Sequence, residues 1–222
     1  MTARPPYLSL QRLRIPLWGA AALAALAAIA RLLVASPAFA HHPAERLDEV
    51  MEENEPAFEM TDVRRLPELN LIDAAGQEVR LENLSDQIVV LSFAPEACGA
   101  PCEAQLALLE RVREAVNITP MKDMVNFVRV VEPLATGLSD ANAIEASPAA
   151  GATVADMAGD FAELSSQGGA EPLAHVIDRR SRHSGLFRGD AFGRMNMVLY
   201  INGLTNARPP KPGLIEKLGA FF

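Results

Sequence analysis

The segment QIVVLSFA, residues 87–94, leads directly into both cysteines of the chain and then into a helical pattern. It is apolar at nearly every position, which is typical of a strand buried on both faces of a sheet. Downstream, four apolar residues recur at helical spacing: Leu106, Leu109, Val112 and Val116. This spacing predicts an amphipathic helix. A buried strand that passes into a helix through a short loop indicates an α/β fold.

The rest of the chain adds elements of the same class. Residues 69–81 alternate apolar and polar around a turn at 73–76, which predicts a hairpin. A second buried strand is expected at 126–132, parallel to the first if the helix between them is a crossover. A loop (134–152), a helix (154–164), a strand–turn–strand unit (173–189) and a closing helix (194–204) complete the pattern. This order predicts a thioredoxin-like α/β sandwich of three layers, with a central mixed β-sheet and flanking helices.

The two cysteines, Cys98 and Cys102, are four positions apart at the junction of strand and helix. The start of a helix carries partial positive charge, so a thiolate there is stabilised and its pKa falls. This spacing puts both sulfurs on one side of the first turn, at the carboxyl edge of the sheet, where open α/β folds bind ligands. The residues alone leave three alternatives: a redox pair, two ligands of a soft metal, or a structural disulfide.

The first 40 residues have the layout of an export signal. Arg4, Arg12 and Arg14 precede an apolar run at 17–30, and the small residues of SPAFA follow. The leucines and valine after Arg31 offer an alternative, an uncleaved anchor with membrane attachment through residues 17–35. Both alternatives predict an exported protein, placed in the periplasm, soluble or anchored to the inner membrane. Two cysteines in an oxidising compartment can form one disulfide.

The charge of the chain narrows its partners. Without the four arginines of residues 1–40, 16 basic and 28 acidic side chains remain, a formal charge of −12 on 182 residues. Such a surface disfavours nucleic acid as a partner. The remaining length suits one domain. We expect an acidic linker at 41–65, either as a short helix or as a loose chain, the thioredoxin-like domain at 66–206 and a C-terminal tail at 207–222.

Several strings of this sequence resemble the Sco/SenC family over roughly residues 67–206. They are LNLIDAAGQEVRLENL, VVLSFAPEAC with the Cys-x-x-x-Cys pair, and HVIDRRSRHSGLFRGDAFGRMNMVLYINGLTN. The resemblance implies an exported thioredoxin-fold copper chaperone and thiol reductant for assembly of cytochrome c oxidase. It implies that Cys98 and Cys102 are the reactive thiols and two copper ligands. The implied partner is a cytochrome c oxidase subunit or another thiol protein.

The chain departs from the family at the third copper ligand. The family places a histidine eight residues before the aspartate that corresponds to Asp178, and this position is Ala170 here. His175 remains a candidate third ligand, although its alternating position in a strand favours a packed core histidine. His183, in the string RRSRHSG, is predicted to be solvated. Methionines, and His41 with His42 at the end of the signal segment, offer other soft or imidazole donors.

The chain also departs from the family beside its cysteines, and the loss of the family's histidine together with Pro172 favours thiol chemistry. The family has a proline after each cysteine, where this chain has Gly99 and Glu103. Pro172 lies six residues before Asp178, the offset at which TlpA-type thiol-disulfide reductases carry a cis-proline; an ordinary trans proline at the start of a strand is the alternative. The sequence therefore leaves two functions and, as a third alternative, a degenerate scaffold. One is a copper-binding accessory protein without turnover. The other is a thiol-disulfide oxidoreductase in which Cys98 attacks and the second cysteine resolves.

Overall fold

The computed structural model describes residues 43–134, 142–149 and 151–207. The expected export segment (1–40), the expected membrane attachment (17–35) and all but the first residue of the expected tail lie outside this part. Within the described residues, no helix combines the length and apolarity needed to cross a membrane.

The predicted elements appear in the predicted order, and strands at 58–63 and 143–148 and three short 3₁₀ helices are additional. In chain order, the elements are α2 (Pro43–Asn54), β1 (Phe58–Val63), β2 (Leu71–Asp73), β3 (Glu78–Val79), η2 (Leu81–Leu84), β4 (Ile88–Ala94), η3 (Glu96–Cys98), α3 (Ala100–Asn117), η4 (Pro120–Met124), β5 (Val125–Val131), β6 (Ala143–Pro148), α4 (Val154–Ala162), β7 (Leu173–Ile177), β8 (His183–Arg188) and α5 (Arg194–Asn206).

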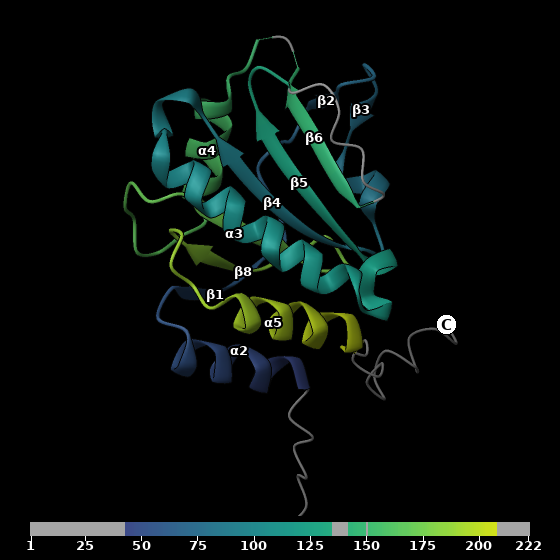
Figure 1. Ribbon diagram of the computed structural model, residues 1–222, viewed down its shortest axis with the longest axis vertical. Coiled ribbons are helices and arrows are strands. Elements are labelled where there is room, and N and C mark those ends of the chain that lie inside the picture. Colours follow the sequence, from purple (N-terminus) through teal and green to yellow (C-terminus); the bar gives the residue numbers. More distant parts are fainter. Residues whose placement is uncertain (1–42, 135–141, 150, 208–222) are drawn as a thin grey trace, which may run out of the picture. The chain divides into compact units, whose positions relative to one another are not determined.

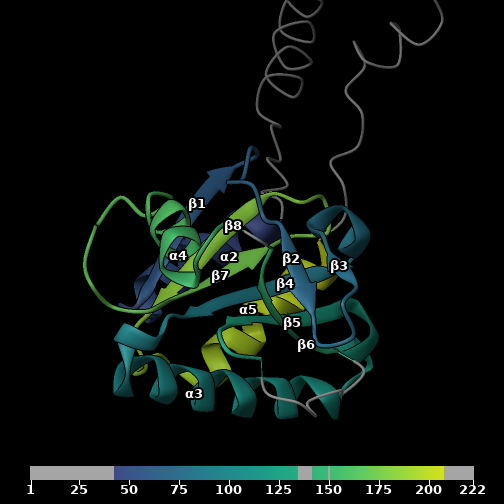
Figure 2. The ribbon, with the colours of Figure 1, turned by 90° about the horizontal axis from the view of Figure 1, so that it is seen from above.

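The strands form one mixed sheet with the order β1-β8-β7-β4-β5-β6-β2-β3. The pairs β4–β5 and β5–β6 are parallel, whereas β7 runs antiparallel to β4. The predicted hairpin is β2–β3, and the predicted strand–turn–strand unit is β7–β8. The helices lie on both sides of the sheet (Figures 1 and 2), so the predicted three-layer α/β architecture is confirmed.

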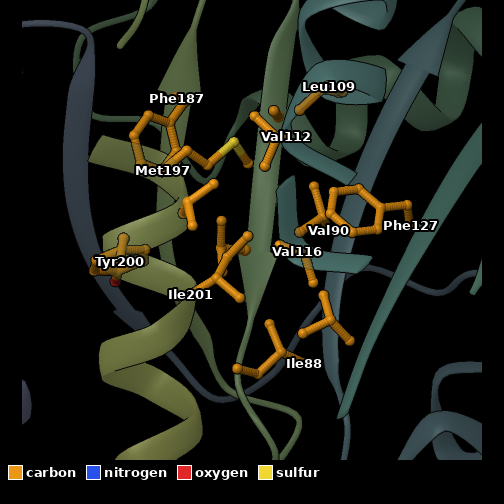
Figure 3. Close-up of a cluster of buried hydrophobic side chains, with 14 of the residues drawn as sticks. Ile88, Val90, Leu109, Val112, Val116, Phe127, Phe187, Met197, Tyr200 and Ile201 are labelled. Atoms are coloured by element: carbon orange, nitrogen blue, oxygen red, sulfur yellow. The ribbon is translucent and has the colours of Figure 1, made fainter. Parts of the chain in front are cut away.

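Alternation along β4 divides the core into two clusters. Ile88 and Val90 face α2, α3 and α5, whereas Val89 and Leu91 face α4 on the other side of the sheet. Figure 3 shows the first cluster, in which side chains of α5 such as Ile201 pack toward those of α3 and β4. Side chains pack against both faces of β4, and this packing holds the strand in place. The cysteine loop, which begins where β4 ends, is therefore held at a defined position.

The acidic segment 41–65 contains a short helix, one of its two expected forms, but the expectation of a linker is wrong, because its described residues belong to the folded domain. They contain α2 and the edge strand β1, which pairs antiparallel with β8. Phe58 is buried, with its ring centroid 4.7 Å from that of Tyr200 and 5.1 Å from that of Phe187. Met51 is the other buried apolar residue. Two apolar anchors therefore hold a segment whose average composition is polar.

The expected loop at 134–152 is also wrong in part, because residues 143–148 form β6. This strand pairs parallel with β5 and antiparallel with β2. Its sequence, AIEASP, has weak strand propensity. Neighbours on both sides supply its backbone hydrogen bonds, so tertiary pairing decides its conformation.

Candidate functional site

Cys98 and Cys102 are joined by a disulfide at the carboxyl end of β4. Cys98 ends the short helix η3, and Cys102 lies in the first turn of α3. Their sulfurs are 1.96 Å apart and their Cα atoms 5.7 Å apart. Cys98 is half-buried, whereas Cys102 is buried. The structure thus brings together the two cysteines that the sequence predicted as a pair, and Cys98 is the more exposed of the two.

Gly99 makes the connection between the two cysteines. It has φ +59° and ψ −136°, a conformation that side chains with a Cβ rarely adopt. Proline is fixed near φ −65° and does not fit this backbone. The glycine that replaces the proline of the Sco/SenC pattern is therefore required by the path of the loop.

Cys102 also contacts the strand that precedes the loop. Its Sγ lies 3.6 Å from the carbonyl oxygen of Phe93. A sulfur in a disulfide carries no proton, so this contact becomes a hydrogen bond only when the pair is reduced. The carbonyl would then accept from the Cys102 thiol and hold it at the end of β4.

Gln105, one turn after Cys102, ties the reactive end of α3 to the neighbouring strands. Its side chain is buried, and Nε2 donates to the carbonyl oxygens of Pro172 and Gly189 at 2.8 Å each. The sequence analysis did not identify this residue. The sequence does contain a signal for it. Gln105 is a polar residue one turn after Cys102, on a helix whose apolar side is expected to be buried, so a buried hydrogen-bonding role could have been predicted.

The peptide bond before Pro172 is trans, which is the second of the two alternatives that the sequence left open. Among the described residues the cis peptide bond is Glu132–Pro133, so Glu171–Pro172 is trans. The carbonyl of Pro172 accepts from the backbone N–H of Gly189 at 2.8 Å as well as from Gln105. Pro172 thus acts as an anchoring point for α3 at the start of β7.

His175 is buried on the face of the sheet opposite to α3. It pairs with Leu91 in the sheet, and its ring packs against those of Phe161 and Phe93, with centroids 5.3 and 6.0 Å away. Nδ1 lies 3.0 Å from Nε2 of His183. Burial lowers the pKa of His175 well below its usual value, and the neighbouring His183 lowers it further. The structure therefore places His175 in the core, as its strand position indicated, and not beside the cysteines.

The prediction that His183 is solvated is wrong, because the side chain is fully buried. Asp178 explains the difference. Its carboxylate accepts from the backbone N–H groups of Arg180 and Arg182 at 2.8 and 3.1 Å, which closes the turn before His183. His183 is consequently the first residue of β8, and burial lowers its pKa to about 4.

The described residues do not assemble a complete metal site. No group of three or more His, Cys, Asp or Glu side chains in this part of the chain is arranged to hold a metal ion. Ala170 lies exposed in the segment before β7. Two thiolates from a reduced Cys98–Cys102 pair would supply soft donors for copper(I), and a third donor would have to come from elsewhere.

The fold of the chain matches solved structures, whereas no family model and no curated protein matches its sequence. BsSco, a member of the Sco family of cytochrome c oxidase assembly proteins, superposes with a TM-score of 0.52 and 10% identity, over 68% of this chain and 98% of BsSco. The chain has the fold of the Sco proteins. A SCO1/SenC family lipoprotein from Bacillus anthracis str. Ames gives a TM-score of 0.50 and 13% identity, over 65% of this chain and 98% of the lipoprotein.

Yeast Sco1 with copper bound gives a TM-score of 0.51 and 11% identity, over 66% of this chain and 96% of Sco1. The predicted resemblance to the Sco/SenC family is thus confirmed at the level of the fold.

Proposed function

We propose that this chain is an exported Sco/SenC-like protein that uses Cys98 and Cys102 for thiol–disulfide exchange with a protein partner during copper-centre assembly of cytochrome c oxidase. The observation that carries the proposal is the disulfide between these residues at the carboxyl end of β4. The Sco fold supports the assignment of the pathway. The export segment and the periplasmic location are parts of the same proposal.

The unequal burial of the two cysteine residues supports different roles for them. In the reduced protein Cys98, the more exposed, attacks a disulfide of the partner and forms a mixed disulfide. Cys102 then loses its proton and attacks Cys98, and the partner leaves as a dithiol. The partner gains two electrons and two protons, and the Cys98–Cys102 bond forms again. The start of α3 stabilises negative charge on the sulfurs during both steps.

Copper is the cargo of the alternative function, in which the chain binds the metal and passes it to the partner. The described donors fit this less well, because the position of the family's histidine is Ala170 and His175 is committed to the core. A third ligand would have to come from His41 or His42, which lie outside the described residues, or from the partner. We therefore place thiol exchange first.

Trapping the mixed disulfide tests the proposed function. Full-length protein is reduced and then mixed with a disulfide-linked peptide. We expect the Cys102→Ser variant to accumulate a covalent adduct, because its resolving thiol is gone, and the Cys98→Ser variant to form little. Equal trapping by both variants, or by neither, would overturn the assigned roles.

Copper(I) titration of the reduced protein separates the two functions. Thiol exchange alone predicts no stoichiometric binding tighter than about micromolar, which corresponds to about 8 kcal/mol. Tight binding that disappears in Cys98→Ser would instead favour delivery of copper by this chain.

A further inference from the structure

A cavity of about 510 Å³ opens beside α3, and its wall begins one residue after Cys102 in the sequence. Its wall includes Glu103, the residue after Cys102, and Ser92, near the end of β4. From there it extends along α3 over β5 and β6. In Figure 1, α3 crosses the sheet in front of β4, and β5 and β6 lie beside it. The cavity therefore lies where a protein engaged with Cys98 would also contact the chain.

The walls of the cavity are largely apolar, but they contain one carboxylate with an unmet hydrogen-bonding need. Leu106, Leu109 and Phe127 supply apolar surface. The side chain of Glu145, on β6, is only 8% exposed. Its Oε1 lies 3.4 Å from Nε of Arg129, and its Oε2 has no hydrogen-bond partner in the described part of the chain. A buried oxygen without a hydrogen-bond partner raises the free energy of the folded protein. A donor that reached Oε2 from the cavity would remove this penalty.

The charges around the cavity favour a cation as that donor. Among the wall carboxylates, Glu110 is already engaged by Arg113 through two hydrogen bonds of 2.5 and 2.9 Å. Glu145 is paired with Arg129 through Oε1 alone, and Glu103 is the third wall carboxylate. Two arginines, Arg113 and Arg129, line the same wall, so its carboxylates outnumber its cations by one. The formal charge of −12 on residues 41–222 adds a long-range attraction for basic partners.

The length of the cavity suits a polypeptide. Between Glu103 and Glu110, α3 advances about 10 Å, which is about three residues of extended chain. We propose that this cavity is the docking site for the partner segment that flanks the reactive cysteine. This segment carries a lysine or arginine beside an apolar side chain, with the cation on Glu145 and the apolar group against Leu106. The inference rests on the proposed exchange function, because it places the same partner at the same disulfide.

Two synthetic peptides test the docking site on oxidised full-length protein. Each has one reduced cysteine followed by glycine and leucine; one continues with lysine and the other with glutamate. The peptide thiolate attacks Cys98, a peptide–Cys98 disulfide forms, and Cys102 leaves as a thiolate that takes up a proton. Each rate is divided by the rate with dithiothreitol, which needs no docking site. We expect the lysine peptide to be about tenfold faster than the glutamate peptide.

Three variants locate the origin of this preference. Glu145→Gln should reduce the ratio between the two peptides at least about threefold, since it removes the charge in the cavity. Glu114→Gln is the matched control: it removes the same charge from an exposed position of α3 that does not line the cavity. Ala107→Phe fills the cavity from an exposed lining position without a change in charge, and should slow the lysine peptide.

The outcomes separate this inference from the proposed function. If dithiothreitol reduces the disulfide but both peptides react equally, the docking site is wrong and the exchange function stands. If Glu114→Gln lowers the ratio as much as Glu145→Gln, net charge and not the cavity sets the preference, which also overturns the inference. If neither dithiothreitol nor a peptide reduces the disulfide, the exchange function itself is wrong, and the docking site falls with it.

Discussion

His175 and His183 form a buried pair, with Nδ1 of the first 3.0 Å from Nε2 of the second. Thr61, on β1, completes a chain of polar groups, because its Oγ1 lies 2.6 Å from Nδ1 of His183 and 3.0 Å from the His183 carbonyl oxygen. If the hydroxyl donates to that carbonyl, His183 donates to Thr61 and His175 donates to His183. Every ring nitrogen in these contacts is then satisfied with both histidines neutral.

This pair should make the fold sensitive to mild acid. The pKa of His183 falls from 6.5 to about 4 on folding because of burial, so the unfolded chain takes up a proton that the folded protein refuses. The stability that neutral His183 contributes to the folded protein is fully present above pH 6.5 and is lost as the pH falls toward 4. We expect His183 to account for a loss of about 2–3 kcal/mol in the free energy of unfolding across this window. Urea denaturation at pH 7 and pH 4.5 measures it. A His183→Gln variant should show a smaller pH dependence, and an unchanged dependence would contradict this origin.

The two histidines also show which parts of the fold can be predicted from the sequence and which cannot. Strand β4 and helix α3 were predictable because their apolar periodicity is local and strong. The solvated assignment of His183 failed because the length of the preceding turn is set by the side chain of Asp178, which accepts two backbone hydrogen bonds. A pattern of apolar and polar residues does not show where such a turn ends.

The strands β1 and β6 and the cavity beside α3 were not predicted, because they depend on residues that are distant in the sequence. Strand β1 depends on β8, more than a hundred residues away, and β6 depends on β5 and β2. The cysteine pair of the candidate site was predicted because its residues are only four positions apart in the sequence. Gln105 and Glu145 were missed, since their roles depend on partners and surroundings contributed by other strands.

Asp48 is a destabilising charge at neutral pH. It lies on α2 with little exposure, and its Oδ1 has no hydrogen-bond partner among the described residues. Burial raises its pKa to about 6, although a hydrogen bond with Tyr200 opposes this. The folded state therefore favours the protonated form of Asp48. The stability that this form contributes is present below pH 3.8 and is lost as the pH rises to about 6.

Asp48→Asn should accordingly raise the free energy of unfolding at pH 8 by about 1–2 kcal/mol, discounted for partial access to water. The gain should shrink below pH 6 and vanish below about pH 4. Glu49→Gln is the matched control, because Glu49 is exposed on the same helix. A gain that stays constant with pH would show that the charge of Asp48 is not its source.

Glu59 and Arg188 form a buried ion pair between β1 and β8. Glu59 Oε2 lies 2.6 Å from Arg188 Nη2, and Ser165 and Ser166 also donate to this carboxylate. Burial alone would raise the pKa of Glu59, but these hydrogen bonds outweigh it and lower the pKa to about 2. The contribution to stability is present above pH 4.5 and is lost as the pH falls toward 2.

Removal of this carboxylate charge leaves Arg188 buried without its counter-charge. Glu59→Gln should therefore lower the free energy of unfolding at pH 7 by about 3 kcal/mol. Thermal and urea denaturation beside Glu53→Gln, an exposed glutamate of α2, measure the difference. A loss below about 0.5 kcal/mol, the range of ordinary surface changes, would mean that the pair is not held as described.

Gly99 should tolerate no side chain without cost. Its φ of +59° and ψ of −136° leave open space around the position of a Cβ, so the penalty of Gly99→Ala is one of backbone conformation and not of contact. We expect a loss of about 1–3 kcal/mol in the oxidised protein, measured by urea denaturation. Gly76→Ala, at another positive φ but far from the cysteines in sequence, is the comparison. If Gly99→Ala is neutral, the loop adopts another path in solution.

Gln105 is the buried link between α3 and the start of β7. Replacement by leucine keeps the volume but leaves the carbonyl oxygens of Pro172 and Gly189 without the Nε2 donor, although Pro172 retains the N–H of Gly189. We expect Gln105→Leu to lower the free energy of unfolding by about 2 kcal/mol, the cost of unsatisfied buried acceptors. Gln105→Glu should be worse, because a carboxylate there would face two carbonyl oxygens, and the difference should narrow at low pH as the carboxylate takes up a proton. A leucine variant as stable as the natural protein would show that water replaces the amide, and that α3 is positioned by its apolar face alone.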